Sequence, residues 1–226
     1  SVGIVCDPAI HPLDRMNTFE RALDWLREFQ PLVADACETH RDKLLDFRFL
    51  RGFSHGCKQL YSGDRWALTG EAGVFLDPFY SPGSDFIAMS NTYVTELIAL
   101  DRADKPLGPY ARLFEQLYRS FYENTMSLFR GQYPIFGDAE VMSMKVIWDY
   151  TYYWAVLCQL VFQNRLTDTV LLGEMQAELA EASQLNRDMQ AFLLRWYAVS
   201  PRPNARIMFD QRELDWFVEL NARLHD

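Results

Sequence analysis

The chain has 226 residues, of which 49% are hydrophobic and 23% are charged, a composition typical of a globular protein with a buried core rather than of a disordered chain. Its formal net charge is −9, which argues against binding to nucleic acid or to an anionic membrane surface, because both select clustered Lys and Arg. No apolar run is long enough to cross a bilayer and no signal peptide is visible, so we expect a cytoplasmic protein.

The first hundred residues are predicted to mix strands and helices. Residues 1–6 have the apolar pattern of a buried strand, and because a domain rarely begins inside a core strand we expect further residues upstream in the native protein. Apolar side chains at helical spacing predict a helix over 17–29 capped by Asn17, and Pro31 opens a second helix through residue 38. Three further strands are predicted, over 45–50, 58–61 and 66–69.

From Gly83 onward the pattern is helical. The predicted helices cover 83–100, 110–129, 139–164, 167–187, 188–199 and 211–224, with a loop over 200–204. The expected fold class is therefore α+β, with a mixed first third and a helical remainder.

One stretch, residues 65–87, carries the clearest functional pattern. Gly70-Glu71-Ala72-Gly73 follows the strand predicted over 66–69 and combines a carboxylate, which accepts hydrogen bonds from ribose or ribitol hydroxyls, with small residues that let the backbone approach a ligand. A turn at 77–78 is followed by Ser81-Pro82-Gly83, which opens a helix. A helix N-terminus presents free N–H groups and a partial positive charge.

This stretch resembles the second dinucleotide motif of the flavin monooxygenases and flavin-dependent halogenases. Further segments with the same resemblance are 3–5, 18–22, 53–55, 132–133, 136–138 and 148–150. The resemblance implies the C-terminal part of a two-domain, p-hydroxybenzoate-hydroxylase-like FAD-binding fold, with a small sheet remnant followed by a mainly helical region. Residues 1–100 would complete the FAD and substrate domain, and 101–226 would form the helical C-terminal region.

The resemblance also implies a cofactor and a chemistry. Glu71 would hold the ribitol of FAD, and the helix that begins at Gly83 would lie under the flavin ring. Oxygen activation through a flavin hydroperoxide would then hydroxylate or halogenate an aromatic compound. The cofactor-binding residues that the resemblance implies are Gly70, Glu71, Gly73, Asp77, Pro78, Ser81, Pro82, Gly83 and Ser84.

The sequence departs from this family in several places. The acid is Glu71 where the motif has Asp, and Tyr80 stands where the tryptophan-type halogenases carry a functional Glu. Pro82 has no N–H and so removes one of two amides that hold halide in the halogenases, which favours hydroxylation. No Gly-x-Gly-x-x-Gly loop and no catalytic Lys can be identified, so catalytic residues are not assigned and this chain alone is expected to bind FAD poorly. The lysines with no motif context are expected to be surface charges, and these are Lys43, Lys58, Lys105 and Lys145.

The expected ligands and partners follow from the same resemblance. An aromatic small-molecule substrate is expected, with a flavin reductase or a missing N-terminal half as partner, and association of the chain with itself. Scattered cysteines and histidines predict no metal site and no disulfide framework. The alternatives are a non-catalytic helical binding module and one half of a split flavoenzyme. The candidates for the substrate pocket are His55, Phe79, Tyr80, Trp148 and Tyr152.

Overall fold

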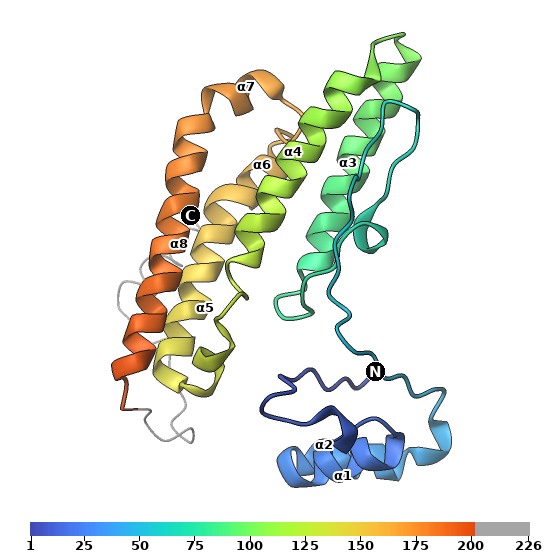
Figure 1. Ribbon diagram of the computed structural model, residues 1–226, viewed down its shortest axis with the longest axis vertical. Coiled ribbons are helices and arrows are strands. Elements are labelled where there is room, and N and C mark those ends of the chain that lie inside the picture. The colour runs from blue at the N-terminus through green and yellow to red at the C-terminus, as the bar shows by residue number, and fades with distance from the viewer. Residues whose placement is uncertain (202–226) are drawn as a thin grey trace, which may run out of the picture. The chain divides into compact units, whose positions relative to one another are not determined.

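The computed structural model describes residues 1–201, which divide into two compact units, one ending at Phe53 and the other beginning at Ser54 (Figure 1). The described part of the chain is helical. Its helices are α1 (Phe19–Phe29), α2 (Pro31–Thr39), α3 (Pro82–Arg102), α4 (Leu107–Met126), α5 (Ala139–Tyr153), α6 (Gln159–Phe162), α7 (Thr169–Glu174) and α8 (Gln176–Val199). Short 3₁₀ turns cover Leu13–Arg15, Arg41–Lys43, Gly70–Ala72 and Tyr133–Gly137, and a π-helical segment covers Trp154–Cys158.

The first unit is a pair of helices, α1 and α2. The side chain of Thr18 accepts a hydrogen bond of 3.4 Å from the amide of Arg21, so Thr18 and not the predicted Asn17 caps α1. The Asn17 side chain instead accepts a bond of 3.0 Å from the Arg21 guanidinium. Leu23 and Leu26 of α1 are buried together with a small residue of α2. The helix itself was predicted correctly from this apolar face.

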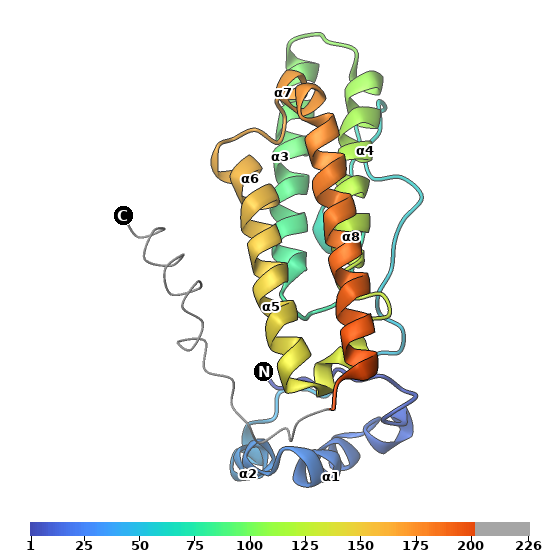
Figure 2. The same cartoon turned by 90° about the vertical axis from the view of Figure 1, so that its left-hand side faces the viewer.

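The second unit is built on four long helices. Figure 2 shows α3, α4, α5 and α8 side by side, with α3 packed against α4 and α5 packed against α8. The larger core lies on the α3–α4 pair, where the rings of Tyr93 and Phe114 stack with centroids 4.9 Å apart. A smaller core joins α5 to α8 through Val141 and Leu193. The side chain of Asp138 accepts from two amides of the first turn of α5, which fixes where that helix begins.

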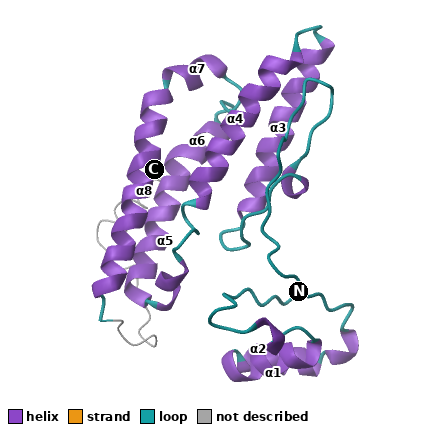
Figure 3. Cartoon of the chain, in the orientation of Figure 1, coloured by secondary structure: helices purple, strands orange, loops and turns teal. Residues whose placement is uncertain are grey.

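The predicted α+β class, with its sheet remnant, is wrong. Residues 1–201 contain helices and loops but no β-strand (Figure 3). The segment 1–6 is largely exposed, with Val2 at 59%, and 45–50 is irregular, with Leu45 at 98%. The segments 58–61 and 66–69 do meet, but through a single bridge between Tyr61 and Ala67. One such pair, without a third segment beside it, is too short to form a sheet.

The apolar side chains of these segments are buried against helices instead. Leu60 and Tyr61 are fully buried and belong to the same core as α3 and α4. A second isolated bridge joins His55 to Phe75. Residues 54–76 therefore form an irregular segment whose hydrophobic side chains complete a helical core. An apolar run in the sequence is compatible with this role as well as with a strand.

The predicted helices of the second unit are present, with two changes at their breaks. The helix expected over 139–164 contains the π-helical segment Trp154–Cys158 between α5 and α6. The break expected near residue 187 lies at Met175, between α7 and α8. The helix predicted over 211–224 and most of the loop predicted over 200–204 lie outside the described residues. The division of the chain near residue 100 stays a prediction.

None of the helices in the described residues combines the length and the apolar character needed to cross a membrane.

Candidate functional site

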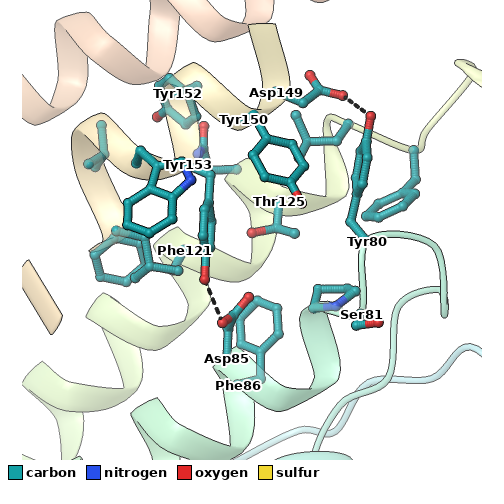
Figure 4. Close-up of a pocket in the computed structure, with 17 residues that line it drawn as sticks. Tyr80, Ser81, Asp85, Phe86, Phe121, Thr125, Asp149, Tyr150, Tyr152 and Tyr153 are labelled. Atoms are coloured by element: carbon teal, nitrogen blue, oxygen red, sulfur yellow. Dashed lines mark hydrogen bonds between the residues drawn. The ribbon is translucent and has the colours of Figure 1, made fainter. Parts of the chain in front are cut away.

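A cavity of about 360 Å³ lies in the second unit, beside the N-terminal turn of α3 (Figure 4). Its walls come from α3, α4, the loop after α4, α5 and the π-helical segment. Eight of its lining residues are aromatic, which gives it flat apolar walls suited to a planar ligand. The lining residues are Tyr80, Ser81, Pro82, Asp85, Phe86, Phe121, Asn124, Thr125, Leu128, Phe129, Asp149, Tyr150, Tyr152, Tyr153, Trp154, Val156 and Leu157.

The turn that leads into α3 has a strained backbone. Tyr80 and Ser81 have φ values of 65° and 55°, in the left-handed region that non-glycine residues seldom occupy. Such a conformation persists only where surrounding contacts hold it. Here the Tyr80 hydroxyl donates a hydrogen bond of 3.1 Å to Asp149 of α5, as Figure 4 shows. Pro82 then occupies the first turn of α3, where its missing N–H costs no helical hydrogen bond.

Asp149 belongs to a buried polar cluster between α5 and α8. Lys145 is fully buried, and its ammonium donates to Asp149 over 2.7 Å and to Gln190 over 2.8 Å. The Gln190 amide in turn donates to the other oxygen of Asp149 over 2.7 Å. The hydroxyl of Tyr80, the ammonium of Lys145 and the amide of Gln190 all donate to the Asp149 oxygens, as an ionised carboxylate requires. The expectation that Lys145 is a surface charge is wrong.

Burial and charge attraction have opposite effects on the pKa values of the two charged residues in this cluster. Burial raises the pKa of Asp149 and lowers the pKa of Lys145, while the attraction between their charges opposes both shifts. Burial and the Asp149 charge also raise the pKa of Tyr80 well above its ordinary value. The Tyr80 hydroxyl therefore keeps its proton and acts as a hydrogen-bond donor at the edge of the cavity.

A second carboxylate, Asp85, stands in the first turn of α3. Its Oδ1 accepts a hydrogen bond of 2.9 Å from the hydroxyl of Tyr153 on α5 (Figure 4). Burial raises the pKa of Asp85, and the bond from Tyr153 lowers it. Burial also raises the pKa of Tyr153, so that hydroxyl is the donor of the pair. The cavity thus has two tyrosine–aspartate hydrogen bonds, one on each side.

The π-helical segment Trp154–Cys158 shapes one wall. Such a segment adds one residue to the helical turn, which rotates the following side chains by about 100° around the axis. Trp154, Val156 and Leu157 of this segment all line the cavity. Segments of this kind are frequent at functional sites because they aim side chains that a regular helix would place elsewhere.

The Gly70–Gly73 stretch lies close to the start of α3. It forms one turn of 3₁₀ helix. Gly70 has φ 52°, and a Cβ on it would lie 2.4 Å from Ile87 Cγ1, so the position requires glycine on two grounds. A Cβ built on Gly83 would lie 3.2 Å from Glu71 Oε1. The Glu71 carboxylate therefore lies over the first turn of α3, where the sequence motif placed a ligand.

The structure brings together some of the predicted site residues. Tyr80, Ser81, Pro82 and Tyr152 all line the cavity. The other pocket candidates lie elsewhere. His55 contacts the backbone carbonyl of Glu71 over 2.9 Å, the ring of Phe79 packs on Phe136, and the Trp148 indole donates to Asn186 of α8.

Other predicted residues of the motif fix the turn before α3. Asp77 accepts a bond of 2.8 Å from the amide of Phe79 and another from the hydroxyl of Tyr133. Sequence reasoning missed Asp85, Tyr153 and the Lys145–Asp149 pair. The i,i+4 spacing of Lys145 and Asp149 on an otherwise apolar stretch was the signal that could have found that pair. Within residues 1–201 no three His, Cys, Asp or Glu side chains come close enough to hold a metal ion.

Comparison with known proteins gives one distant relative. Over 145 residues the chain is 23% identical to the flavin-dependent halogenase chlA of Dictyostelium discoideum. The aligned part is 63% of this chain and 24% of that protein, so the chain spans about a quarter of its relative's length. No family model matches the chain, and no solved structure matches it. The chain is thus distantly similar to a flavin-dependent halogenase, at the level of a flavoenzyme-like relationship.

Proposed function

We propose that the chain is the substrate-binding part of a flavin-dependent oxidoreductase that acts on an aromatic small molecule. The observation that carries this proposal is the position of the cavity. Tyr80, Ser81 and Pro82 line the cavity. The same three residues lead into α3 in the part of the sequence that resembles the flavin motif. A ligand in the cavity would therefore lie beside the helix end that the motif assigns to the flavin ring.

The residues at this helix end fit a flavin edge. Among the described residues, the Glu71 carboxylate is the one neighbour within 4 Å of a Cβ built on Gly83, so this carboxylate borders the space over the first turn of α3. Glu71 would accept from a ribitol hydroxyl, and the amide of Gly83 would face the ring. The amide of Ser84 already donates to the carbonyl of Ser81 over 3.3 Å. Pro82 offers no N–H, which leaves fewer donors there than a helix start without proline would have. When bound, the flavin would supply the redox chemistry, and a reductase or a second polypeptide would supply the reducing equivalents.

The chain's own residues would bind and orient the aromatic substrate. The rings of Phe86, Tyr150 and Trp154 line the cavity and give it apolar surface for an aromatic ligand. The hydroxyls of Tyr80 and Tyr153 are held as donors to the buried carboxylate of Asp149 and the half-buried carboxylate of Asp85, so they do not compete with the reaction as nucleophiles. Between the two chemistries that the resemblance allows, Pro82 favours hydroxylation over halogenation because one halide-binding amide is missing.

A second function has its own supporting observation. The sequence contains no Gly-rich loop for the pyrophosphate of FAD. A helical module that binds an aromatic ligand without flavin, or one half of a split flavoenzyme, would have such a sequence. Both alternatives include the aromatic cavity. The binding module differs from the first proposal in that it binds no flavin, and the split flavoenzyme differs in that it binds flavin together with a second polypeptide.

The test is a titration of FAD into the purified chain, followed by flavin fluorescence. Quenching that Glu71→Ala weakens, and that the exposed control Glu178→Ala on α8 leaves unchanged, supports the flavoenzyme. Absence of quenching by a folded chain that still binds a bicyclic aromatic ligand supports the binding module. A chain that binds neither flavin nor aromatic ligand overturns both proposals.

A further inference from the structure

The charges that line the cavity are all of one sign. Its lining includes two carboxylates, Asp85 and Asp149, and no Lys, Arg or His. An aromatic acid entering such a cavity would bring a third negative charge into a partly desolvated space, with no cation to meet it. The lining therefore disfavours an anionic aromatic ligand relative to a neutral or cationic one.

The two carboxylates differ in what already neutralises them. Asp149 is 2% exposed, and its charge is matched by the buried ammonium of Lys145. Asp85 has no Lys, Arg or His within ion-pair distance among the described residues. The Asp85 carboxylate accepts its hydrogen bond from the neutral hydroxyl of Tyr153. Asp85 is thus the carboxylate of the cavity whose charge is not compensated by a cation of the described chain.

Aromatic residues lie beside this uncompensated carboxylate and elsewhere along the wall of the same cavity. Figure 4 shows Asp85 turned toward the hydroxyl of Tyr153 and beside the ring of Phe86. Tyr150 and Trp154 line the same cavity. Ring faces attract cations through their quadrupole, and a carboxylate accepts a strong hydrogen bond from an ammonium. A carboxylate and aromatic side chains on one cavity wall are the groups that bind protonated amines in proteins.

We propose that the cavity takes an aromatic amine in its protonated form, with the ring between the aromatic walls and the ammonium on Asp85. The free oxygen of Asp85 accepts a hydrogen bond from the ammonium, and nearby ring faces share its charge. Asp85 is thereby the residue that determines specificity. This inference deepens the proposed function, and it rests on that function only where it calls the ligand a substrate. Binding of the amine can be measured without flavin.

The experiment compares three probes that share an indole ring and differ in the end of a short side chain. Tryptamine is cationic, tryptophol is neutral and indole-3-acetate is anionic. Isothermal titration calorimetry with the full chain is expected to rank tryptamine first, about tenfold or more tighter than tryptophol, with indole-3-acetate weakest, as expected for one charge-assisted hydrogen bond. The tryptamine affinity also falls with added salt, whereas that of tryptophol does not.

Two matched variants test whether Asp85 is the residue that causes the preference for a cationic ligand. Asp85→Asn keeps an oxygen that can accept from Tyr153 and is expected to reduce tryptamine affinity about tenfold while changing tryptophol affinity less than about twofold. Asp101→Asn makes the same substitution about 24 Å further along α3, outside the cavity, and leaves all three affinities unchanged. Should Asp85→Asn fail to fold, the ranking and the salt dependence of the unmodified chain decide.

The outcomes separate this inference from the proposed function. Binding of tryptophol or indole-3-acetate as tight as that of tryptamine overturns the charge selection but leaves an aromatic-binding cavity. Equal weakening of all three probes by Asp85→Asn also overturns it, because it would show a structural role for the side chain. Binding of none of the probes overturns it together with the aromatic-ligand part of the proposed function.

Discussion

Replacement of Lys145 by Met is the sharpest test of the buried cluster between α5 and α8. Lys145 is fully buried and makes two hydrogen bonds from its charged amine, of 2.7 Å to Asp149 and 2.8 Å to Gln190. Bonds of this kind contribute about 1.5–3 kcal/mol each. Their loss also leaves a buried carboxylate without a cation, a change that costs about 3–5 kcal/mol where one partner of a buried pair is removed. We therefore expect Lys145→Met to lower the free energy of unfolding by about 3–5 kcal/mol.

The assay is urea unfolding followed by far-ultraviolet circular dichroism, with two companion variants. Lys105→Met removes an exposed lysine and is expected to change the free energy of unfolding by less than about 0.5 kcal/mol. Adding Asp149→Asn to Lys145→Met removes the unpaired charge, so the double variant is expected to be about 2 kcal/mol more stable than the sum of the two single losses predicts.

The same variant has a defined dependence on pH. Without Lys145, the burial that raises the pKa of Asp149 is no longer opposed by a neighbouring cation. A raised folded-state pKa of a carboxyl contributes stability at low pH that is lost as pH rises through that pKa. The deficit of Lys145→Met relative to the unmodified chain is therefore largest near neutral pH and shrinks as the pH falls and Asp149 takes up a proton. A loss below about 1 kcal/mol at neutral pH, or strictly additive variants, would refute the view that the pair is a buried ion pair.

Three further substitutions test the turn before α3, the motif and the first helix, each by the shift of the urea midpoint. Tyr80→Phe removes one hydrogen bond to a buried carboxylate and is expected to cost about 1–3 kcal/mol, and an unchanged midpoint would contradict the role given to that bond. Gly70→Ala is expected to cost about 2 kcal/mol because of its positive φ and the crowding at its Cβ, whereas Gly173→Ala, in open space within α7, is expected to be neutral or to stabilise by up to about 1 kcal/mol. Thr18→Ala is expected to cost about 1 kcal/mol as a lost helix cap and Asn17→Ala less, and the reverse order would restore the cap predicted from sequence.

Within residues 1–201, local sequence was sufficient to predict the long helices, although not every break between them. The apolar residues of 83–100 and 110–129 repeat at helical spacing, and that spacing alone sets the buried face of α3 and α4. Sheet formation is a different matter, because a strand is stable only beside a partner that local pattern does not reveal. Residues 58–61 have the apolar content of a strand, yet they complete a helical core. The predicted sheet failed for this reason.

The residues that line the cavity were harder to predict from the sequence than the helices were. Tyr80 and Tyr152 were identified through their motif and their aromatic character, and both line it. Asp85 and Tyr153 are 68 positions apart, and nothing in either segment indicates that they meet. The π-helical segment that aims Trp154 into the cavity likewise has no local signature that we could use.

Asp149 links the two halves of the proposed site, since one of its oxygens accepts from both Lys145 and Tyr80. The ion pair fixes Asp149, Asp149 fixes the Tyr80 hydroxyl, and Tyr80 holds the left-handed turn from which α3 starts. A ligand in the cavity would contact Tyr80, whose hydroxyl donates to Asp149, so its binding would affect the conformation of the helix end proposed for the flavin. Aromatic ligand and flavin should therefore bind with mutual dependence, because each site includes residues that set the conformation of the other.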